Sequence, residues 1–201
     1  MFFYDIPNLL AILILIVASF RMGLIPLWLS FFLGVFALTP FFLNDVLFPA
    51  TYMPDQFAYY DRVHDIRSQG IISGLFNIDS DFNVKMLVSN WMLAIIPLPY
   101  VETIKSLGFF NRLIATALTI WLYSSKNLRG WPLIFVLFYP SFLLYSSLAL
   151  RDTLVLVFMI APVILFIENR RLLALIVSSP LFFIKFQNFF LILIFFVVHL
   201  Y

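Results

Sequence analysis

Residues 139–171 read YPSFLLYSSLALRDTLVLVFMIAPVILFIENRR, and in them a charge pair, Arg151 and Asp152, stands between two apolar runs. No glycine, asparagine or second charge lies beside the pair to make an ordinary polar loop. Ionisable groups at or inside a membrane boundary are costly unless they face a wet, protein-lined cavity. The pair therefore indicates a functional site. The alternative interpretation is an ion pair that marks the turn between two membrane segments.

The composition of the whole chain is typical of a polytopic membrane protein. Of its 201 residues, 64% are hydrophobic and 11% are charged, whereas a soluble domain carries about 25% charged residues. We expect an all-α fold, a transmembrane helical bundle of about six to seven membrane segments, because helices satisfy their own backbone in lipid. With no internal repeat or low-complexity linker, residues 1–201 form one predicted domain.

Several classes of function are disfavoured by the same composition. The net charge is +2 and the charged residues are scattered, so no basic stripe could track a nucleic-acid backbone. Cysteine is absent, which removes disulfides and thiolate catalysis. The sequence has no glycine-rich phosphate loop and no histidine pair at metal-binding spacing. We expect no metal site, no cofactor and no nucleic-acid partner.

Charge placement predicts the topology. The apolar runs are separated by basic turns at Arg21, at Lys126 and Arg129, and at Arg170 and Arg171, and positive residues in short loops favour the cytoplasmic side. Arg151 then faces outward. The predicted membrane segments are residues 6–20, 24–48, 107–123, 131–150, 153–167, 172–184 and 186–201.

The sizeable polar region, residues 49–85, is predicted to be an external loop. Residues 55–67 contain no Gly or Pro and favour a short helix, with Phe57, Tyr60 and His64 on one face. Such a helix lies on the membrane surface or over a cavity. The alternative is a helix in a solvated loop that simply faces water. The next segment, residues 84–100, is expected to be re-entrant or interfacial. The competing solution is a full crossing that breaks the positive-inside pattern once.

This topology places several cations at the outward ends of the helices, although positive residues usually prefer the cytoplasmic side. Arg112, Arg151 and Lys185 are predicted to lie below a loop that supplies Arg62 and Arg67. Guanidinium groups suit phosphates because they offer fixed donors and keep their charge, and a lipid-linked diphosphate sugar is an anion that reaches this place. The predicted transfer assigns charge stabilisation to arginine. The proton acceptors considered are His64, Asp55, Asp61 and Asp65.

Short motifs along the chain resemble the bacterial polysaccharide polymerases of the Wzy and EpsG type. The motifs are FNRLI (110–114), YPSFLLYSSLALRDTL (139–154), ENRR (168–171), IKFQNF (184–189) and DQFAYY (55–60). The resemblance implies a multi-pass enzyme of the bacterial inner membrane that joins undecaprenyl-diphosphate-linked oligosaccharide repeats at the outer face, in O-antigen or exopolysaccharide synthesis. It implies a functional role for Arg151 and, more weakly, for Arg112. Asp55, Tyr59 and Tyr60 match an acidic residue followed by tyrosines in the first external loop of that family.

The chain departs from the family pattern in two places. Relatives commonly place a histidine where this chain reads Lys185, Phe186, Gln187 and Asn188. Relatives also continue through further membrane segments, so we expect a fragment or a shortened member. The predicted site comprises catalytic Arg151, His64 and Asp55, with substrate contacts from Arg112, Lys185, Arg62, Arg67, Asp152, Tyr59 and Tyr60.

Two other classes of function remain open on the sequence alone. One is a non-catalytic membrane subunit that binds a lipid-linked sugar or assists a polysaccharide assembly complex. The other is a small transporter, which needs a polar path through the middle of its helices. The ionisable residues here are predicted at helix ends, which disfavours transport.

Overall fold

The computed structural model describes residues 3–44, 46–76 and 84–200, and every regular element in these ranges is a helix. The predicted all-α class is therefore confirmed. The elements are η1 (Phe3–Asp5), α1 (Ile6–Arg21), α2 (Leu27–Ala37), α3 (Thr39–Leu43), η2 (Ala50–Tyr52), α4 (Asp55–Gln69), α5 (Ile71–Phe76), α6 (Val84–Ile95), α7 (Ile104–Ser124), α8 (Trp131–Phe138), α9 (Pro140–Tyr145), α10 (Asp152–Ile167), α11 (Arg171–Ile184) and α12 (Phe186–Leu200).

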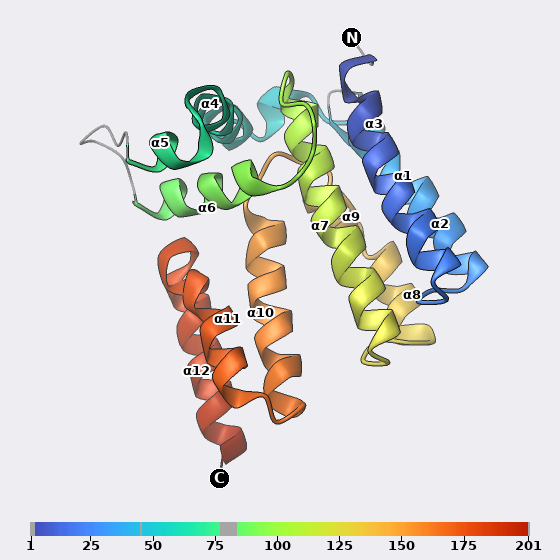
Figure 1. The fold of residues 1–201 in the computed structure, drawn as a ribbon, viewed down its shortest axis with the longest axis vertical. Helices are drawn as coiled ribbons and strands as arrows, with labels where there is room; N and C mark the ends of the chain where they lie inside the picture. Colours follow the sequence, from blue (N-terminus) through green and yellow to red (C-terminus); the bar gives the residue numbers. More distant parts are fainter. Residues whose placement is uncertain (1–2, 45, 77–83, 201) are drawn as a thin grey trace.

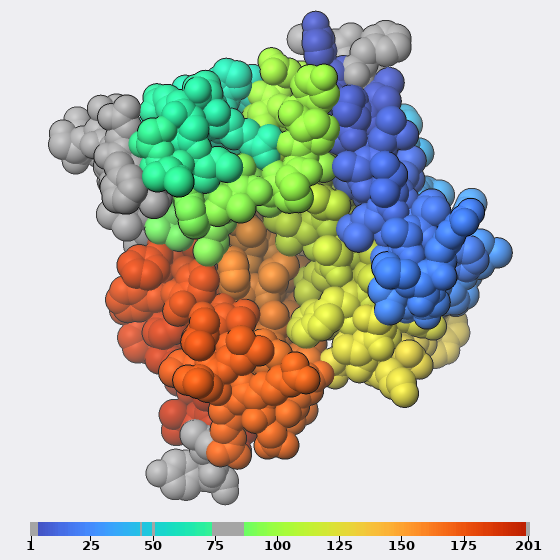
Figure 2. All heavy atoms as spheres, viewed as in Figure 1, coloured from blue at the N-terminus to red at the C-terminus, as the bar shows by residue number. Residues whose placement is uncertain are grey.

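The long helices run roughly along one direction, and three others lie across them at one end (Figure 1). The turns after α7 and after α10 lie at the bottom of the view, whereas α4, α5 and α6 lie at the top. In the space-filling view the atoms of α4 and α6 form a layer above those of α10, α11 and α12 (Figure 2). The layer of α4 and α6 thus lies at the end of the molecule where α10 begins. Asp79 and Asp81, assigned to the external loop, lie outside the described residues.

Two predicted membrane segments are each divided into two helices near a proline. A kink at Pro40 was expected in the run 24–48, whereas the run 131–150 was expected to be one helix. The run 24–48 forms α2 and α3, which meet at Leu38, and α3 ends at Leu43. The run 131–150 forms α8 and α9, which meet at Tyr139, and α9 ends at Tyr145. Pro40 and Pro140 each lie in the first turn of the second helix of the pair, because a proline has no N–H to donate and restricts the residue before it.

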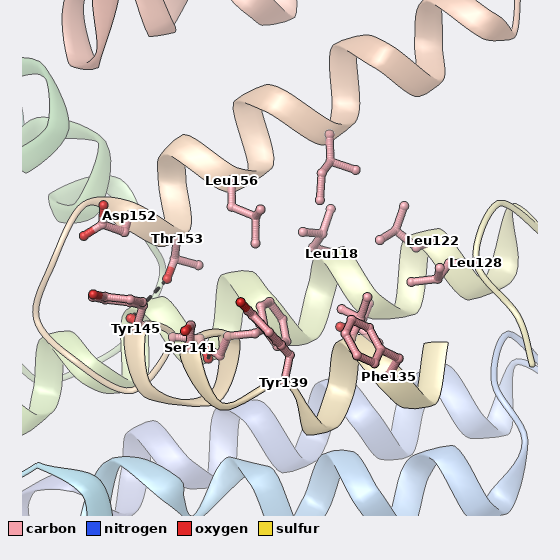
Figure 3. Close-up of a pocket in the computed structure, with 15 residues that line it drawn as sticks. Leu118, Leu122, Leu128, Phe135, Tyr139, Ser141, Tyr145, Asp152, Thr153 and Leu156 are labelled. Atoms are coloured by element: carbon pink, nitrogen blue, oxygen red, sulfur yellow. Dashed lines mark hydrogen bonds between the residues drawn. The ribbon is translucent and has the colours of Figure 1, made fainter. Parts of the chain in front are cut away.

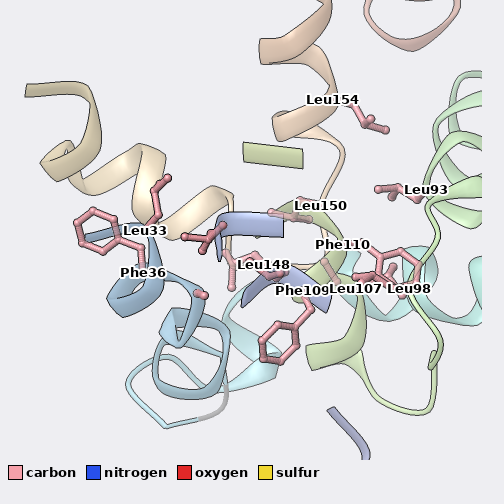
Figure 4. Close-up of a cluster of buried hydrophobic side chains, with 14 of the residues drawn as sticks. Leu33, Phe36, Leu93, Leu98, Leu107, Phe109, Phe110, Leu148, Leu150 and Leu154 are labelled. Atoms are coloured by element: carbon pink, nitrogen blue, oxygen red, sulfur yellow. The ribbon is translucent and has the colours of Figure 1, made fainter. Parts of the chain in front are cut away.

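The hydrophobic core gathers around the first half of α7. Phe109 and Phe110 are fully buried, and Phe109 packs edge-on against Phe41 with ring centroids 4.8 Å apart. Leu148 and Leu150, from the segment between α9 and α10, are buried in the same cluster (Figure 4). The core is therefore built where α7 meets the chain just before Arg151.

Crossing a bilayer takes about 20 mostly apolar residues in one helix. Among the helices of the described ranges, none meets the requirement for both length and apolar character.

Candidate functional site

The segment Ser146–Leu150, here called the linker, joins α9 to α10 and is buried although it is not helical. Its five residues are each at most 7% exposed. Buried backbone groups outside regular structure need partners from elsewhere in the protein. The linker precedes Arg151 directly, so whatever holds the linker also holds the backbone at Arg151.

Two side-chain amides supply partners for the linker backbone. Asn111, on α7, donates through Nδ2 to the carbonyl oxygens of Leu148 and Leu150, at 2.5 and 2.6 Å. Gln56, on α4, accepts from the Ala149 N–H through Oε1 at 2.9 Å. The same Gln56 oxygen accepts from Asn44 Nδ2 at 3.1 Å. The linker is therefore fixed from α7 on one side and from α4 on another.

Arg112 adds a further set of bonds to this segment. Its Nη2 donates to Ser147 Oγ at 2.6 Å and to the Leu143 carbonyl at 2.9 Å, and the side chain is 2% exposed. Thr39 Oγ1 lies 2.8 Å from the same Ser147 hydroxyl. Arg112 is thus in the interior, where its Nη2 bonds to the protein, and does not lie with the surface cations as we had expected.

Gly108 allows α7 to approach the linker closely. A Cβ at this position would overlap the Ser147 carbonyl oxygen and touch the ring of Pro40. The Ser147 oxygen that this Cβ would meet belongs to the backbone. A rotamer change therefore cannot move that oxygen away. The close contact of α7 with the linker requires glycine here.

Arg151 and Asp152 stand at the start of α10 and are half-buried. Asp152 Oδ1 lies 3.9 Å from Lys185 Nζ at the end of α11, with both side chains 42% exposed. A partly exposed pair of this kind contributes at most about 1 kcal/mol of stability. The pair does, however, place the cation of Lys185 beside the start of α10.

Tyr59 connects α4 to these charges. The side chain is buried, and burial raises the pKa of its phenol; the positive charge of Arg151 partly opposes that rise, as does a hydrogen bond with Ser89. The negative charges of Asp152 and Asp55 act in the other direction. The three charged residues Arg151, Asp152 and Asp55 thus each lie within electrostatic reach of a fourth residue, Tyr59. With Lys185 they form a group that we call the Arg151 cluster.

His64 and Tyr60 lie elsewhere on α4. His64 Nδ1 is 3.1 Å from the Val101 carbonyl oxygen, and its ring is 5.9 Å from that of Tyr60. The phenol of Tyr60 has a raised pKa, through partial burial and then the charge of Glu102. These two side chains thus face the connection between α6 and α7. None of their described contacts joins them to the Arg151 cluster.

Arg67 closes the end of α6. Its Nε donates to the Ala94 carbonyl at 3.0 Å, Nη1 donates to that of Leu98 at 2.6 Å, and Nη2 donates to that of Ile96. The guanidinium also lies over the ring of Phe110, 4.6 Å from its centroid. Burial lowers the pKa of Arg67 below its usual value. Because its guanidinium donates to three backbone carbonyls, Arg67 has a structural role at the end of α6.

Arg62 is half-buried and has an interaction partner within the protein. Within the described ranges, no three histidine or acidic side chains are grouped as metal ligands. The polar groups at the Arg151 cluster can bind an anion through Arg151 and Lys185. They can accept a proton through a carboxylate.

Sequence reasoning missed the residues that hold the linker, namely Gln56, Gly108 and Asn111. A signal was present for Asn111, because an amide inside an otherwise apolar helix needs a partner when it is buried. Nothing in the sequence said that the partner was the backbone before Arg151. That pairing joins residues 37 and 39 positions apart.

No family model, no curated protein and no solved structure matches this chain.

Proposed function

We propose that this protein is a glycosyltransferase of the bacterial inner membrane that polymerises undecaprenyl-diphosphate-linked oligosaccharide repeats at the outer face of that membrane. The observation that carries the proposal is the buried linker, held from α4 and α7, which leads directly into Arg151 and Asp152, the carboxylate paired with Lys185. A binding group needs a rigid support to act in one geometry. The resemblance of residues 139–154 to polysaccharide polymerases coincides with this segment.

The location in a membrane is supported by the side chains that the fold leaves exposed. Large apolar residues on several helices face outward, among them Ile14 (68%), Leu27 (69%), Phe31 (66%), Leu172 (73%) and Val198 (65%). Exposed apolar surface of this extent marks contact with another protein or with lipid. With 11% charged residues, lipid is the partner we propose.

The short helices require an adaptation of the bilayer. Both α1 and α10 have 16 residues, or about 24 Å at 1.5 Å per residue, against a hydrocarbon core of roughly 30 Å. A helix shorter than the local core thins the bilayer around it. A thinned membrane brings the head groups of a lipid-linked substrate closer to the Arg151 cluster.

The proposed chemistry uses one cation pair and one carboxylate. Arg151 and Lys185 bind the diphosphate, and the guanidinium of Arg151 stabilises the charge that develops on it as the bond from the anomeric carbon to the diphosphate oxygen breaks. A hydroxyl of the acceptor sugar forms the new bond to that carbon. Its proton passes to Asp55, which is exposed and lies within electrostatic reach of Tyr59. We favour Asp55 over His64 because His64 faces the α6–α7 connection.

A second candidate, a non-catalytic subunit that binds a lipid-linked sugar for an assembly complex, draws on the pairing of Lys185 with Asp152. That pairing lowers the net positive charge beside Arg151. A site with weaker positive charge can bind a diphosphate, but it stabilises less strongly the negative charge that develops on the diphosphate as a leaving group.

The test of the proposed function is deletion of the gene followed by complementation. Unpolymerised lipid-linked repeats should accumulate on deletion and should disappear when the wild-type gene returns. Arg151→Ala, expressed at the wild-type level, should leave them accumulated, whereas Arg129→Ala, at the opposite end of the bundle, should clear them. Clearance by Arg151→Ala would favour the non-catalytic subunit.

A further inference from the structure

A groove of about 330 Å³ lies between α7, the α8–α9 pair and α10, beside the Arg151 cluster. Phe135, Tyr139 and Tyr145 line it and are exposed, so the groove is open to the surface. The volume falls at the lower end of the range for ligand pockets, roughly 300–1,000 Å³. The space is therefore large enough for part of a ligand.

The two ends of the groove differ in chemistry (Figure 3). Asp152, Thr153 and Tyr145 lie at one end. Leu122, Leu128 and Phe135 lie at the other. Asp152 supplies the single carboxylate of the lining, and it is adjacent in the chain to Arg151. An occupant that fits this pattern is apolar along its length and polar at the end near Arg151.

We propose that this groove holds a section of the prenyl chain of the lipid-linked substrate, with the phosphate-bearing end of the lipid at Arg151. The choice of a prenyl lipid rests on the proposed function, and the groove adds where its chain lies. One groove accommodates one chain, so a single-chain prenyl phosphate leaves no second chain exposed, as a two-chain phospholipid does. The polar end of the groove lies next to two cations that do not line it: Lys185, whose Nζ is 3.9 Å from Asp152 Oδ1, and Arg151, which precedes Asp152 in the chain. Their positive charges complement an anionic head group.

The experiment is photo-crosslinking of the purified full chain in lipid nanodiscs. The probe is a prenyl phosphate with a photoactivatable group at the far end of its chain. We expect adducts on residues 118–128 or on Phe135, and loss of these adducts with excess unlabelled prenyl phosphate. Phosphatidylglycerol at the same concentration should not compete.

Variants that fill the groove provide the control. Leu156→Trp, on α10, should reduce the adduct roughly tenfold, because displaced methylene groups lose their burial. Leu128→Trp, in the turn after α7, serves as a second filling variant if Leu156→Trp does not fold. Leu191→Trp, on the exposed face of α12, should leave labelling unchanged.

Adducts outside the groove, equal labelling of the filled variants, or equal competition by phosphatidylglycerol would overturn the proposal. Its failure is separable from failure of the proposed function. Labelling that follows the groove while Arg151→Ala still clears lipid-linked repeats in cells would refute the enzyme and keep the groove. Loss of polymerisation in Arg151→Ala without groove labelling would do the reverse.

Discussion

Asn111 and Gly108 lie in the part of α7 that contacts the linker. Asn111 donates hydrogen bonds to the linker backbone, and Gly108, which lacks a side chain, leaves room for it. A buried amide that bonds two carbonyls of an irregular segment fixes that segment more narrowly than apolar packing does. At the scale of single residues, the position of Arg151 is thus a consequence of side chains around 40 positions earlier in the chain.

Gly108→Ala tests this contact. The added methyl group meets the Ser147 carbonyl, so we expect a loss of roughly 1–3 kcal/mol of folding stability, seen as a lower midpoint of thermal unfolding. Gly34→Ala is the matched control, since a Cβ there meets nothing within 4 Å. Its stability should stay the same or rise slightly, because alanine is favoured over glycine in a helix. Equal midpoints for wild type and Gly108→Ala would show that α7 does not press against the linker.

The phenol of Tyr59 reports on its distance from Arg151. Burial raises its pKa while Arg151 opposes the rise, so Arg151→Ala should raise the pKa of Tyr59 further. The difference in phenolate absorbance between each protein and its Tyr59→Phe counterpart isolates this titration. Identical titration curves with and without Arg151 would place the two residues apart.

The same group gives a dependence of stability on pH. The pKa of Tyr59 in the folded protein lies above its unfolded value of about 10. The contribution of its neutral phenol to folding stability is therefore complete below that pH. Above it, ionisation in the unfolded state lowers the stability of the fold. Denaturant unfolding should therefore show a smaller alkaline loss of stability for Tyr59→Phe than for wild type.

At the scale of elements, α6 ends at Ile95, and Arg67 donates to the Ala94 carbonyl in its last turn and to the Ile96 and Leu98 carbonyls just beyond it. The last carbonyls of a helix lack partners within the helix and need donors from outside. Arg67 thereby ties α4 to α6 and keeps both in the layer above α10.

Arg67→Gln should loosen this layer. Loss of charge-assisted bonds to buried carbonyls costs roughly 2–3 kcal/mol, and amide hydrogen exchange should accelerate in residues 92–101. Asp65→Asn, at an exposed position on the same helix, should leave exchange there unchanged. Unchanged exchange in Arg67→Gln would mean that α6 is held by its apolar contacts alone.

The existence of most elements could be predicted from the apolar runs, and their interruptions only in part. The expected helices at 6–20 and 153–167 nearly coincide with α1 and α10, because their lengths are set by flanking polar residues. The end of α9 at Tyr145 was not predicted, since Ser146–Leu150 contains no charged residue, glycine or proline that would end the apolar run 131–150. Its irregular backbone is stabilised by Asn111 and Gln56, and a window of local sequence does not contain these partners.

For the candidate site, the neighbours of Arg151 along the chain were predictable and its neighbours in space were predictable in part. The charges at residues 151, 152 and 185 stood out because each interrupts an apolar run. The separation of His64 from this group was not predictable, because it depends on which face of α4 points at α10. Tyr59 lies within electrostatic reach of Arg151, whereas His64 contacts the Val101 carbonyl.

At the scale of the whole molecule, the layer of α4–α6 and the turns after α7 and α10 lie at opposite ends (Figure 1). The proposed function places the first end outside the membrane and the second in the cytoplasm. Because the chain has no cysteine, single-cysteine variants report on sidedness without background.

An impermeant maleimide applied to intact spheroplasts should therefore label Asp61→Cys, on α4. It should not label Lys126→Cys or Arg170→Cys until the membrane is opened. All three positions are exposed, so a difference in labelling reflects the membrane and not burial. Labelling of Lys126→Cys before opening would invert the proposed topology.

Turnover by the purified protein tests the central claim most directly. In proteoliposomes supplied with undecaprenyl-diphosphate-linked repeats, wild type should extend the repeats into longer chains. Arg151→Ala should extend them at least about 100-fold more slowly, the scale for loss of one group that stabilises developing charge. Arg129→Ala should match wild type. Extension by Arg151→Ala at the wild-type rate would contradict the account.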